Sequence, residues 1–196
     1  MPTGIALRDP REQLFDAAVR ILLRDGANAL TSRAVTTEAE CAKGVLHKHF
    51  ADFDAFLVEL VREHVGRVRL EAATLREAAG TGSVVGNLAA AIPDLFGPVS
   101  LGLLRLVIAR DELRRRLRNG RPAGLPVVTE ATETIAGYLG AERDLGRIAA
   151  DADLTVLAPT LVGAVSMLFT DREAGPPDPE AVRAMVRTVL AGAMPR

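Results

Sequence analysis

The sequence predicts an all-α fold. Apolar residues recur at three- and four-residue steps through most of the 196 residues, which is the period of a helix with one buried face. Runs that alternate with a period of two are few, and stretches such as Val84-Val85 and Val127-Val128 are too short to form a sheet. Asp9-Pro10 and Asp178-Pro179 place a capping residue directly before a proline, as helix N-termini do.

Four helices are expected in the first 80 residues. Their predicted spans are 10–25, 31–39, 42–49 and 53–79. Asp25-Gly26 ends the first helix, because glycine accepts the left-handed backbone that follows a helix C-terminus. Glu40-Cys41 forms the turn between the second and third helices, and Asp52 is the expected N-cap of the long fourth helix. Three short helices followed by a long one are therefore predicted.

The remaining chain is expected to form five more helices. Their predicted spans are 84–96, 99–118, 125–139, 153–170 and 179–193. The polar stretch 140–153 is interpreted as a connection. Pro159 falls inside the eighth helix and should kink it unless the helix begins there.

The composition is that of a globular protein. Apolar residues make up 48% of the chain and the net charge is −1. No stretch reaches the roughly 20 apolar residues of a membrane span, and residues 1–9 lack the apolar core of a signal peptide. The single Cys41 cannot form an internal disulfide, which fits a reducing compartment. We therefore expect a cytoplasmic protein that does not bind membranes.

Residues 41–50 concentrate an unusual set of side chains. They read Cys-Ala-Lys-Gly-Val-Leu-His-Lys-His-Phe and contain both lysines of the chain, Lys43 and Lys48, and two of its three histidines. A short helix with exposed cations and a glycine suits a polyanion such as DNA. Residues 1–64 carry eight Lys and Arg against ten Asp and Glu, so contact with DNA must come from local placement of charge.

Residues 11–60 contain a set of motifs at characteristic spacing. They are Ala17-Ala18, Asp25-Gly26, Thr31, Ala34-Val35, Glu38-Ala39, Lys43-Gly44, Leu46, His49-Phe50 and Asp54-Ala55. Their joint spacing resembles that of the TetR family of bacterial transcriptional regulators. The resemblance implies a three-helix helix-turn-helix head over residues 1–51. It also implies a larger helical body for ligand binding and dimerisation over residues 52–196.

The resemblance further implies which residues contact DNA. They are Thr31, Ser32 and Arg33 at the start of the supporting helix, and Lys43, Gly44, Val45, His47 and Lys48 on the recognition helix. The position of His47 usually holds an aromatic residue that touches phosphate. Leu46, His49 and Phe50 are expected to hold the head together.

Three residues depart from the family pattern. Glu40 occupies a turn position that is usually glycine, where a left-handed backbone costs about 1 kcal/mol. Ala42 replaces the usual Ser or Thr cap of the recognition helix, which forfeits about 1 kcal/mol. Phe53 replaces a commonly basic residue.

The last two helices carry broad apolar stripes with small residues between them. The family resemblance implies that they form a four-helix dimer interface with a second copy, whereas an ordinary intrachain core is the alternative. The residues assigned to the interface are Leu157, Leu161, Val165, Leu168, Val182, Met185, Val186 and Val189.

The middle helices are apolar nearly all round, as buried helices are. In proteins of this family such helices enclose an effector pocket. Leu104, Val107, Tyr138 and Met167 are the predicted lining residues. With no tryptophan and a single tyrosine, the pocket should take a hydrophobic or weakly polar small molecule.

Other kinds of site have weaker support. His47 and His49 diverge on a helix and the chain has no second cysteine, so a metal site is not expected. The arginine run (Arg114, Arg115, Arg116, Arg118 and Arg121) could be a second nucleic-acid patch, but cations at a helix C-terminus are the more ordinary interpretation. No catalytic constellation is present, so neither an enzyme nor a cofactor is expected.

The function that follows is a ligand-responsive, DNA-binding transcriptional regulator. We expect a homodimeric repressor that a small hydrophobic effector releases from a near-palindromic operator of double-stranded DNA. The alternative is a small-molecule-binding or interaction protein of the same fold, with weak or lost operator binding.

Overall fold

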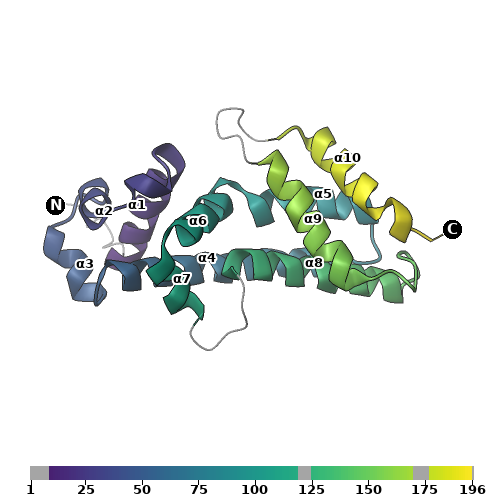
Figure 1. Ribbon diagram of the computed structural model, residues 1–196, viewed down its shortest axis with the longest axis horizontal. Coiled ribbons are helices and arrows are strands. Elements are labelled where there is room, and N and C mark those ends of the chain that lie inside the picture. The colour runs from purple at the N-terminus through teal and green to yellow at the C-terminus, as the bar shows by residue number, and fades with distance from the viewer. Residues whose placement is uncertain (1–8, 119–124, 170–176, 196) are drawn as a thin grey trace, which may run out of the picture. The chain divides into compact units, whose positions relative to one another are not determined.

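The computed structural model of the chain describes residues 9–118, 125–169 and 177–195. Within these ranges all regular structure is helical (Figure 1). The helices are α1 (Pro10–Arg24), α2 (Ser32–Glu38), α3 (Lys43–His49), α4 (Phe53–Glu77), α5 (Val84–Phe96), α6 (Pro98–Ala109), α7 (Asp111–Arg118), α8 (Pro126–Asp144), α9 (Leu154–Leu168) and α10 (Pro179–Leu190). Single 3-10 turns follow α1 at Ala27–Ala29 and α10 at Ala191–Ala193. The predicted all-α fold is confirmed.

The helices group into two compact units. The head unit contains the described residues in 9–62 and 102–118, and the body unit contains those in 63–101, 125–169 and 177–195. The unit that holds the N-terminal helices therefore extends past residue 51, where the sequence suggested a domain boundary. It takes in the beginning of α4, most of α6 and all of α7.

The head unit is built on the buried face of α1. The predicted apolar residues of this helix are all buried: Leu14, Ala17, Ala18, Ile21 and Leu22. Helices α1, α2 and α3 pack against one another (Figure 1). The rings of Phe15, Phe50 and Phe56 join the helices, with ring centroids 5.1 to 5.8 Å apart. Aromatic pairs of this kind stabilise the packing of the head by about 0.5–1.5 kcal/mol each beyond the area that they bury.

The body unit is a cluster of helices around α5, α8, α9 and α10, which pack against one another (Figure 1). Each of these helices buries an apolar stripe, and the residues Leu88, Ile135, Leu161 and Val186 are fully inaccessible. Asp178 is the N-cap of α10 as predicted, and Asp153 caps α9 in the same way, since each accepts a hydrogen bond from a backbone N–H of the first turn.

The two largest differences from the predicted helix spans are a break in one helix and the extension of another. The expected helix over residues 99–118 is broken at Arg110, because Asp111 and Glu112 favour a new N-terminus and Arg110 turns toward other parts of the head. Helix α8 continues to Asp144 rather than residue 139. Its last inward-facing position is Glu142, which is completely buried although it is charged, so the apolar pattern ends before the helix does.

Helix α9 begins at Leu154 and continues through Pro159. Among the described residues, no single helix has both the length and the apolar character needed to cross a membrane. Only the bent pair α5 and α6, taken together, meets that measure of length and composition.

Candidate nucleic-acid interface

Helix α2 is fixed at its start by Thr31. The Thr31 side chain accepts a hydrogen bond from Ala34 N at 3.1 Å, as an N-cap does. Ser32 and Arg33 follow in the first turn, and Arg33 is exposed. The three residues predicted at the start of the supporting helix therefore lie together at the N-terminal end of α2.

The turn between α2 and α3 has a left-handed backbone at Glu40, with φ of 52°. Among the described residues it is the one non-glycine residue with positive φ. Glu40 N donates to Thr37 O at 3.1 Å and Cys41 N donates to Thr36 O at 3.0 Å. These two bonds form the Schellman pattern that closes helix C-termini. The sequence-based expectation of a strained turn at this glutamate is confirmed.

A side chain of α1 also supports the turn. Gln13 Nε2 donates to Ala39 O at 2.8 Å, directly before the strained residue. Three hydrogen bonds thus hold the turn in place whatever side chain occupies position 40. An unfavourable backbone conformation persists where several surrounding contacts hold it, as these do.

Helix α3 starts without a side-chain cap, because Ala42 can offer none. Lys43, Gly44, His47 and Lys48 are exposed along it, whereas Leu46 is fully buried in the head core. The spacing of 43 to 47 and 44 to 48 is one helical turn, so the four exposed residues form a continuous strip. Val45 is partly exposed beside this strip, Phe50 is buried as predicted, and His49 is half-buried.

The cations on α2 and α3 differ from those on α1. Lys43, Lys48 and Arg33 make no ion pair within the part of the chain that the structure describes. Arg11, Arg20 and Arg24 instead pair with Glu59 or Glu38. The unpaired cations can therefore meet an external anion without breaking an internal contact. Glu40 is exposed in the turn between their two helices.

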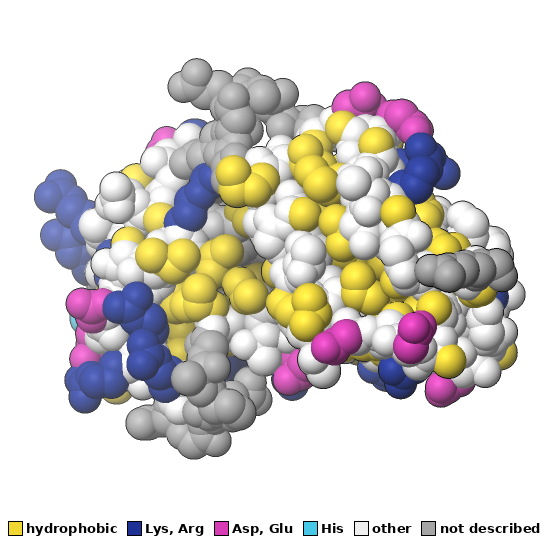
Figure 2. Space-filling view, turned by 45° about the vertical axis from the view of Figure 1, so that its right-hand side comes forward, with side chains coloured by type: hydrophobic (Ala, Val, Ile, Leu, Met, Phe, Trp, Pro, Cys, Tyr) yellow, Lys and Arg dark blue, Asp and Glu magenta, His cyan; other side chains and the backbone are white. Residues whose placement is uncertain are grey.

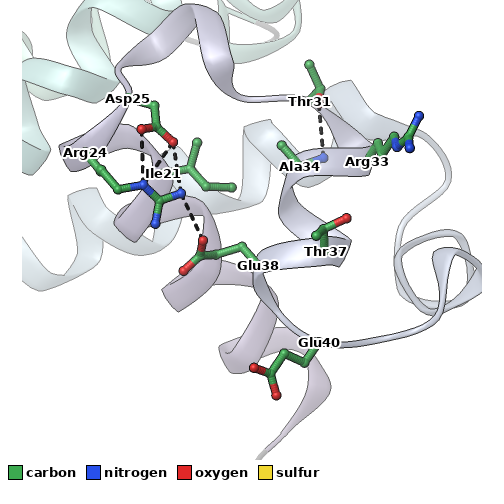
Figure 3. Close-up of a pocket in the computed structure, with 9 residues that line it drawn as sticks. All are labelled: Ile21, Arg24, Asp25, Thr31, Arg33, Ala34, Thr37, Glu38 and Glu40. Carbon is green, nitrogen blue, oxygen red and sulfur yellow. Dashed lines mark hydrogen bonds and ion pairs between the residues drawn. The ribbon is translucent and has the colours of Figure 1, made fainter.

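A shallow groove of about 550 Å³ runs along α2 beside this surface (Figure 3). Its lining residues are Ile21, Arg24, Asp25, Thr31, Arg33, Ala34, Thr37, Glu38 and Glu40. Arg24 turns toward Asp25 and Glu38, whereas Arg33 points away from them (Figure 3). Hydrogen bonds from Arg20 and then Arg24 lower the pKa of Glu38. Glu38 is therefore already paired with arginines of α1, and among the lining residues Arg33 is the cation without an ion pair to the described residues.

The structure corrects part of the predicted effector pocket. Met167 is 68% exposed, so it does not line a buried pocket. Leu104 and Val107 belong to the head unit and Tyr138 belongs to the body unit. Tyr138 is fully buried, but its hydroxyl is occupied by Glu142 Oε1 at 2.5 Å and by Asn87 Nδ2 at 3.0 Å.

The predicted dimer interface divides into two sets. Leu161, Val165, Val182 and Val186 are buried inside the single chain, so they cannot supply surface to a partner; the intrachain-core alternative is correct for them. Leu157, Leu168, Met185 and Val189 are only partly buried. Figure 2 shows apolar side chains gathered on the face over α9 and α10. Val156, which the sequence-based assignment missed, is 57% exposed on α9.

The body also contains polar contacts that sequence patterns did not reveal. His64 Nε2 lies 2.7 Å from Ser100 Oγ, and burial lowers the pKa of His64 to about 4, with a smaller effect from Arg67. Arg69 Nε donates to Glu130 at 2.7 Å. One sequence signal could have indicated buried polar residues on α8. Polar residues recur there every four positions, which places them on one face of the helix, and all four are buried: Glu130, Thr134, Tyr138 and Glu142.

Comparison with known proteins addresses the fold. No protein-family model and no curated protein sequence matches the chain. Solved structures do match over nearly its whole length. A Rhodococcus sp. protein assigned to the TetR-family transcriptional regulators has a TM-score of 0.71 and 18% identity, covering 96% of this chain and 100% of that one. A TetR-family member from Streptomyces coelicolor A3 has a TM-score of 0.67 and 21% identity, covering 93% and 99%.

A third match is the transcriptional regulator FadR from Bacillus subtilis, whose structure contains stearoyl-CoA. Its TM-score is 0.69 at 16% identity, and the match covers 92% of this chain and 98% of that one. The chain has the TetR-family fold. In this fold the helix-turn-helix is α2, the turn at Glu40 and α3, and the exposed strip from Lys43 to Lys48 lies on its second helix.

Proposed function

We propose that the chain is a DNA-binding transcriptional regulator of the TetR family. The observation that carries the proposal is the strip of Lys43, Gly44, His47 and Lys48, exposed on the second helix of a helix-turn-helix and free of internal ion pairs among the described residues. Arg33 supplies a further cation from the first helix. Helices placed in this way enter the major groove, while cations and helix N-termini contact phosphate.

The active species is a homodimer formed through α9 and α10. Leu157, Leu168, Met185 and Val189 supply the contact, because they are apolar and only partly covered by their own chain. A two-fold dimer would present its heads to half-sites about 34–36 Å apart, one turn of DNA, on a near-palindromic operator.

The regulator acts as a repressor that a small hydrophobic effector releases from DNA. The aliphatic composition of the body supports an apolar ligand. FadR from Bacillus subtilis, which shares the fold, binds stearoyl-CoA, so fatty-acyl compounds are the first class to test. The effector changes DNA affinity only through different affinities for the DNA-competent and released states.

A gel-shift experiment tests the proposal. Duplexes covering the DNA that flanks the chain's own gene are titrated with protein, beside a scrambled duplex of equal length and composition. Specific retardation is expected at low salt. The absence of any specific retardation by folded dimer, both here and in selection from a random duplex library, would refute the proposal.

Two substitutions on α3 make the test specific to the interface. Lys43→Ala and Lys48→Ala should each weaken binding, and each should reduce the magnitude of the salt slope by about one per head if the lysine contacts phosphate. Arg67→Ala is the matched control, because Arg67 is exposed on α4 and pairs with Glu63 one turn away. Its affinity and salt slope should match the unmodified protein.

A second candidate function is a TetR-fold small-molecule-binding protein whose head binds operator weakly or not at all. Two features favour this candidate: Glu40 has a left-handed backbone and carries a negative charge, and Ala42 gives α3 no side-chain cap. The double substitution Glu40→Gly, Ala42→Ser discriminates between the two functions. Tight specific binding that appears only in the double variant supports the second candidate, whereas tight binding by the unmodified chain excludes it.

A further inference from the structure

Arg110 joins the α6–α7 segment to two parts of the head unit. Its Nη2 donates to Leu30 O at 2.9 Å, and its guanidinium lies over the Phe53 ring with the Cζ atom 5.4 Å from the centroid. Asp54 Oδ1 is 3.7 Å from Nη1. A planar guanidinium suits this combined hydrogen-bonding and stacking role better than an ammonium would. Arg110 thus connects the start of α2 with the start of α4.

Arg116 makes a second connection from α7. Its Nη1 lies 2.7 and 3.0 Å from the two carboxylate oxygens of Asp52, and its Nε donates to Glu112 at 2.6 Å. Asp52 is also the N-cap of α4, accepting from Ala55 N at 2.7 Å. The hydrogen bond from Arg116, followed by that from Ala55, lowers the pKa of Asp52. The carboxylate therefore stays charged and bound to both elements.

Helix α6 also approaches α1 closely at Gly102. A Cβ atom there would lie 2.7 Å from Leu22 Cγ, closer than a methyl group permits. The segment 102–116 thus contacts the head at three places: on α1, before α2 and before α4.

Two of these places flank the helices that carry the candidate DNA contacts. Leu30 directly precedes Thr31, the N-cap of α2. Asp52 lies two residues after Phe50, the C-cap of α3. A shift at either contact would therefore be transmitted to the end of a helix that presents Arg33 or Lys48.

We propose that Arg110 and Arg116 are positioning residues for DNA recognition, which hold α2 and α3 within the head at the orientation that a half-site requires. The proposal rests on the proposed function. It assigns the arginine run a role that differs from a second nucleic-acid patch, because these guanidinium groups are engaged inside the head. Arg114 and Arg115 pair with Asp111 and Glu112 of their own helix and make no such connection to the described residues of the head.

Salt dependence separates positioning from direct contact with phosphate. A residue that neutralises a phosphate contributes about one to the salt slope per head, whereas a residue that only orients the head contributes nothing to it. Arg116→Ala is expected to weaken operator binding about threefold per head, hence about tenfold for a dimer, since partly exposed ion pairs are worth little individually. Its salt slope should be unchanged between about 50 and 200 mM salt.

The ratio of operator affinity to scrambled-duplex affinity is the second readout. A head whose α2 and α3 are displaced keeps its exposed cations, so binding to the scrambled duplex should change less than twofold while the ratio falls about fivefold or more. Arg110→Ala should behave in the same way. A merely structural loss of folded protein would lower both affinities equally and leave the ratio constant.

Arg115→Ala is the matched control, since it removes the same charge from the same helix and its side chain is 76% exposed. It should leave affinity, slope and ratio unchanged. Arg116→Lys keeps the charge but has a single nitrogen, so it cannot contact Asp52 and Glu112 through separate nitrogens as Arg116 does. It should restore part of the ratio. In an Asp52→Asn background, which retains a capping residue, Arg116→Ala should have little further effect.

The outcomes are distinguishable. The proposal stands if Arg116→Ala and Arg110→Ala lower the ratio at constant slope in protein whose circular dichroism and melting show it to be folded. It is overturned if Arg116→Ala and Arg115→Ala both flatten the slope, which indicates phosphate contact, or if neither arginine variant changes the ratio. If the unmodified protein binds no duplex at low salt, the proposed function fails and the positioning role fails with it.

Discussion

The hydroxyl of Tyr138 donates a hydrogen bond to Glu142 Oε1 at 2.5 Å, and both side chains are fully buried one turn apart on α8. Burial, followed by the hydrogen bond to Glu142, raises the pKa of Tyr138, which therefore remains a donor. The second oxygen of Glu142 faces Gly80 N at 3.3 Å and Arg147 Nε at 3.4 Å. The buried carboxylate thus ties α8 to the loop after α4.

Replacing Tyr138 with phenylalanine is the first test of this network. The change leaves a buried carboxylate with one donor fewer, which costs about 1–3 kcal/mol. The melting temperature followed by circular dichroism should fall by roughly 2–4 °C for each kcal/mol. Glu142→Gln should also destabilise, whereas Glu133→Gln, at an exposed position of the same helix, should change stability by less than about 0.5 kcal/mol. Equal melting temperatures for all three variants would contradict this account.

His64 makes the stability of the body depend on pH. Burial lowers its pKa from 6.5 to about 4, so the unfolded chain takes up a proton between these values while the folded chain does not. The neutral, buried His64 therefore contributes fully to the free energy of unfolding above pH 6.5, and this contribution is lost as pH falls toward 4. At pH 5 the loss amounts to about 2 kcal/mol relative to pH 7.5.

Urea unfolding at pH 7.5 and pH 5 measures this effect. His64→Gln can still reach Ser100 but cannot titrate, so the difference in unfolding free energy between the two pH values should shrink by about 2 kcal/mol. His49→Gln, at a half-buried position on α3, serves as the control and should retain the difference in unfolding free energy. An unmodified pH dependence in His64→Gln would show that another group is responsible.

The sequence predicted the head well because its signals are local. Asp9, Thr31 and Asp52 are caps that act on the next turn of their own helix, and the strain at Glu40 follows from one turn position. At the break at Arg110, Asp111 and Glu112 were a local signal for a new N-terminus, but the partner that holds Arg110, Leu30, is 80 residues away and could not be predicted. Glu142 was missed for a different reason: a buried charge satisfied by distant groups interrupts the apolar periodicity that marks a helix.

The same contrast explains the errors in the candidate sites. The helical period of the sequence identified which face of α9 and α10 is apolar. It could not show which residues of that face are buried in the core and which remain on the surface. Val186 and Val189 lie three residues apart on one stripe, yet the first is fully buried and the second only partly. Which of them meets α5 depends on how the helices pack, and packing is a property of the whole body unit.

Glu40 allows backbone strain and charge to be tested separately. Glu40→Gly removes both, so it should stabilise the chain by about 0.5–1 kcal/mol, after allowance for the greater freedom of glycine in the unfolded state. Glu40→Gln removes only the charge and should leave stability within about 0.5 kcal/mol. Both variants should bind DNA about two- to fivefold more tightly at low salt, because a carboxylate near the phosphates is gone.

Thermal melts measure the stability of each variant, and titration of a scrambled duplex measures its DNA affinity on the same samples. Glu133→Gln removes an equal charge from the body and should change neither. If Glu40→Gln binds DNA no more tightly than the unmodified chain at about 50 mM salt, the glutamate lies too far from the phosphates to matter. A failure of Glu40→Gly to raise the melting temperature would mean that the turn tolerates a side chain without cost.

The partly buried residues of α9 and α10 should control dimerisation. Val189→Glu places a charge within an apolar contact, where an unpaired carboxylate is strongly disfavoured, and should raise the dimer dissociation constant about 100-fold or more. Val186→Glu is unsuitable because this side chain is fully buried and the variant would lose its fold. Leu145→Glu is the matched control, since Leu145 is 57% exposed at the end of α8. Sedimentation velocity should show monomer for Val189→Glu and dimer for Leu145→Glu. A dimer that survives Val189→Glu, Met185→Glu and Leu157→Glu alike would place the interface on another surface of the chain.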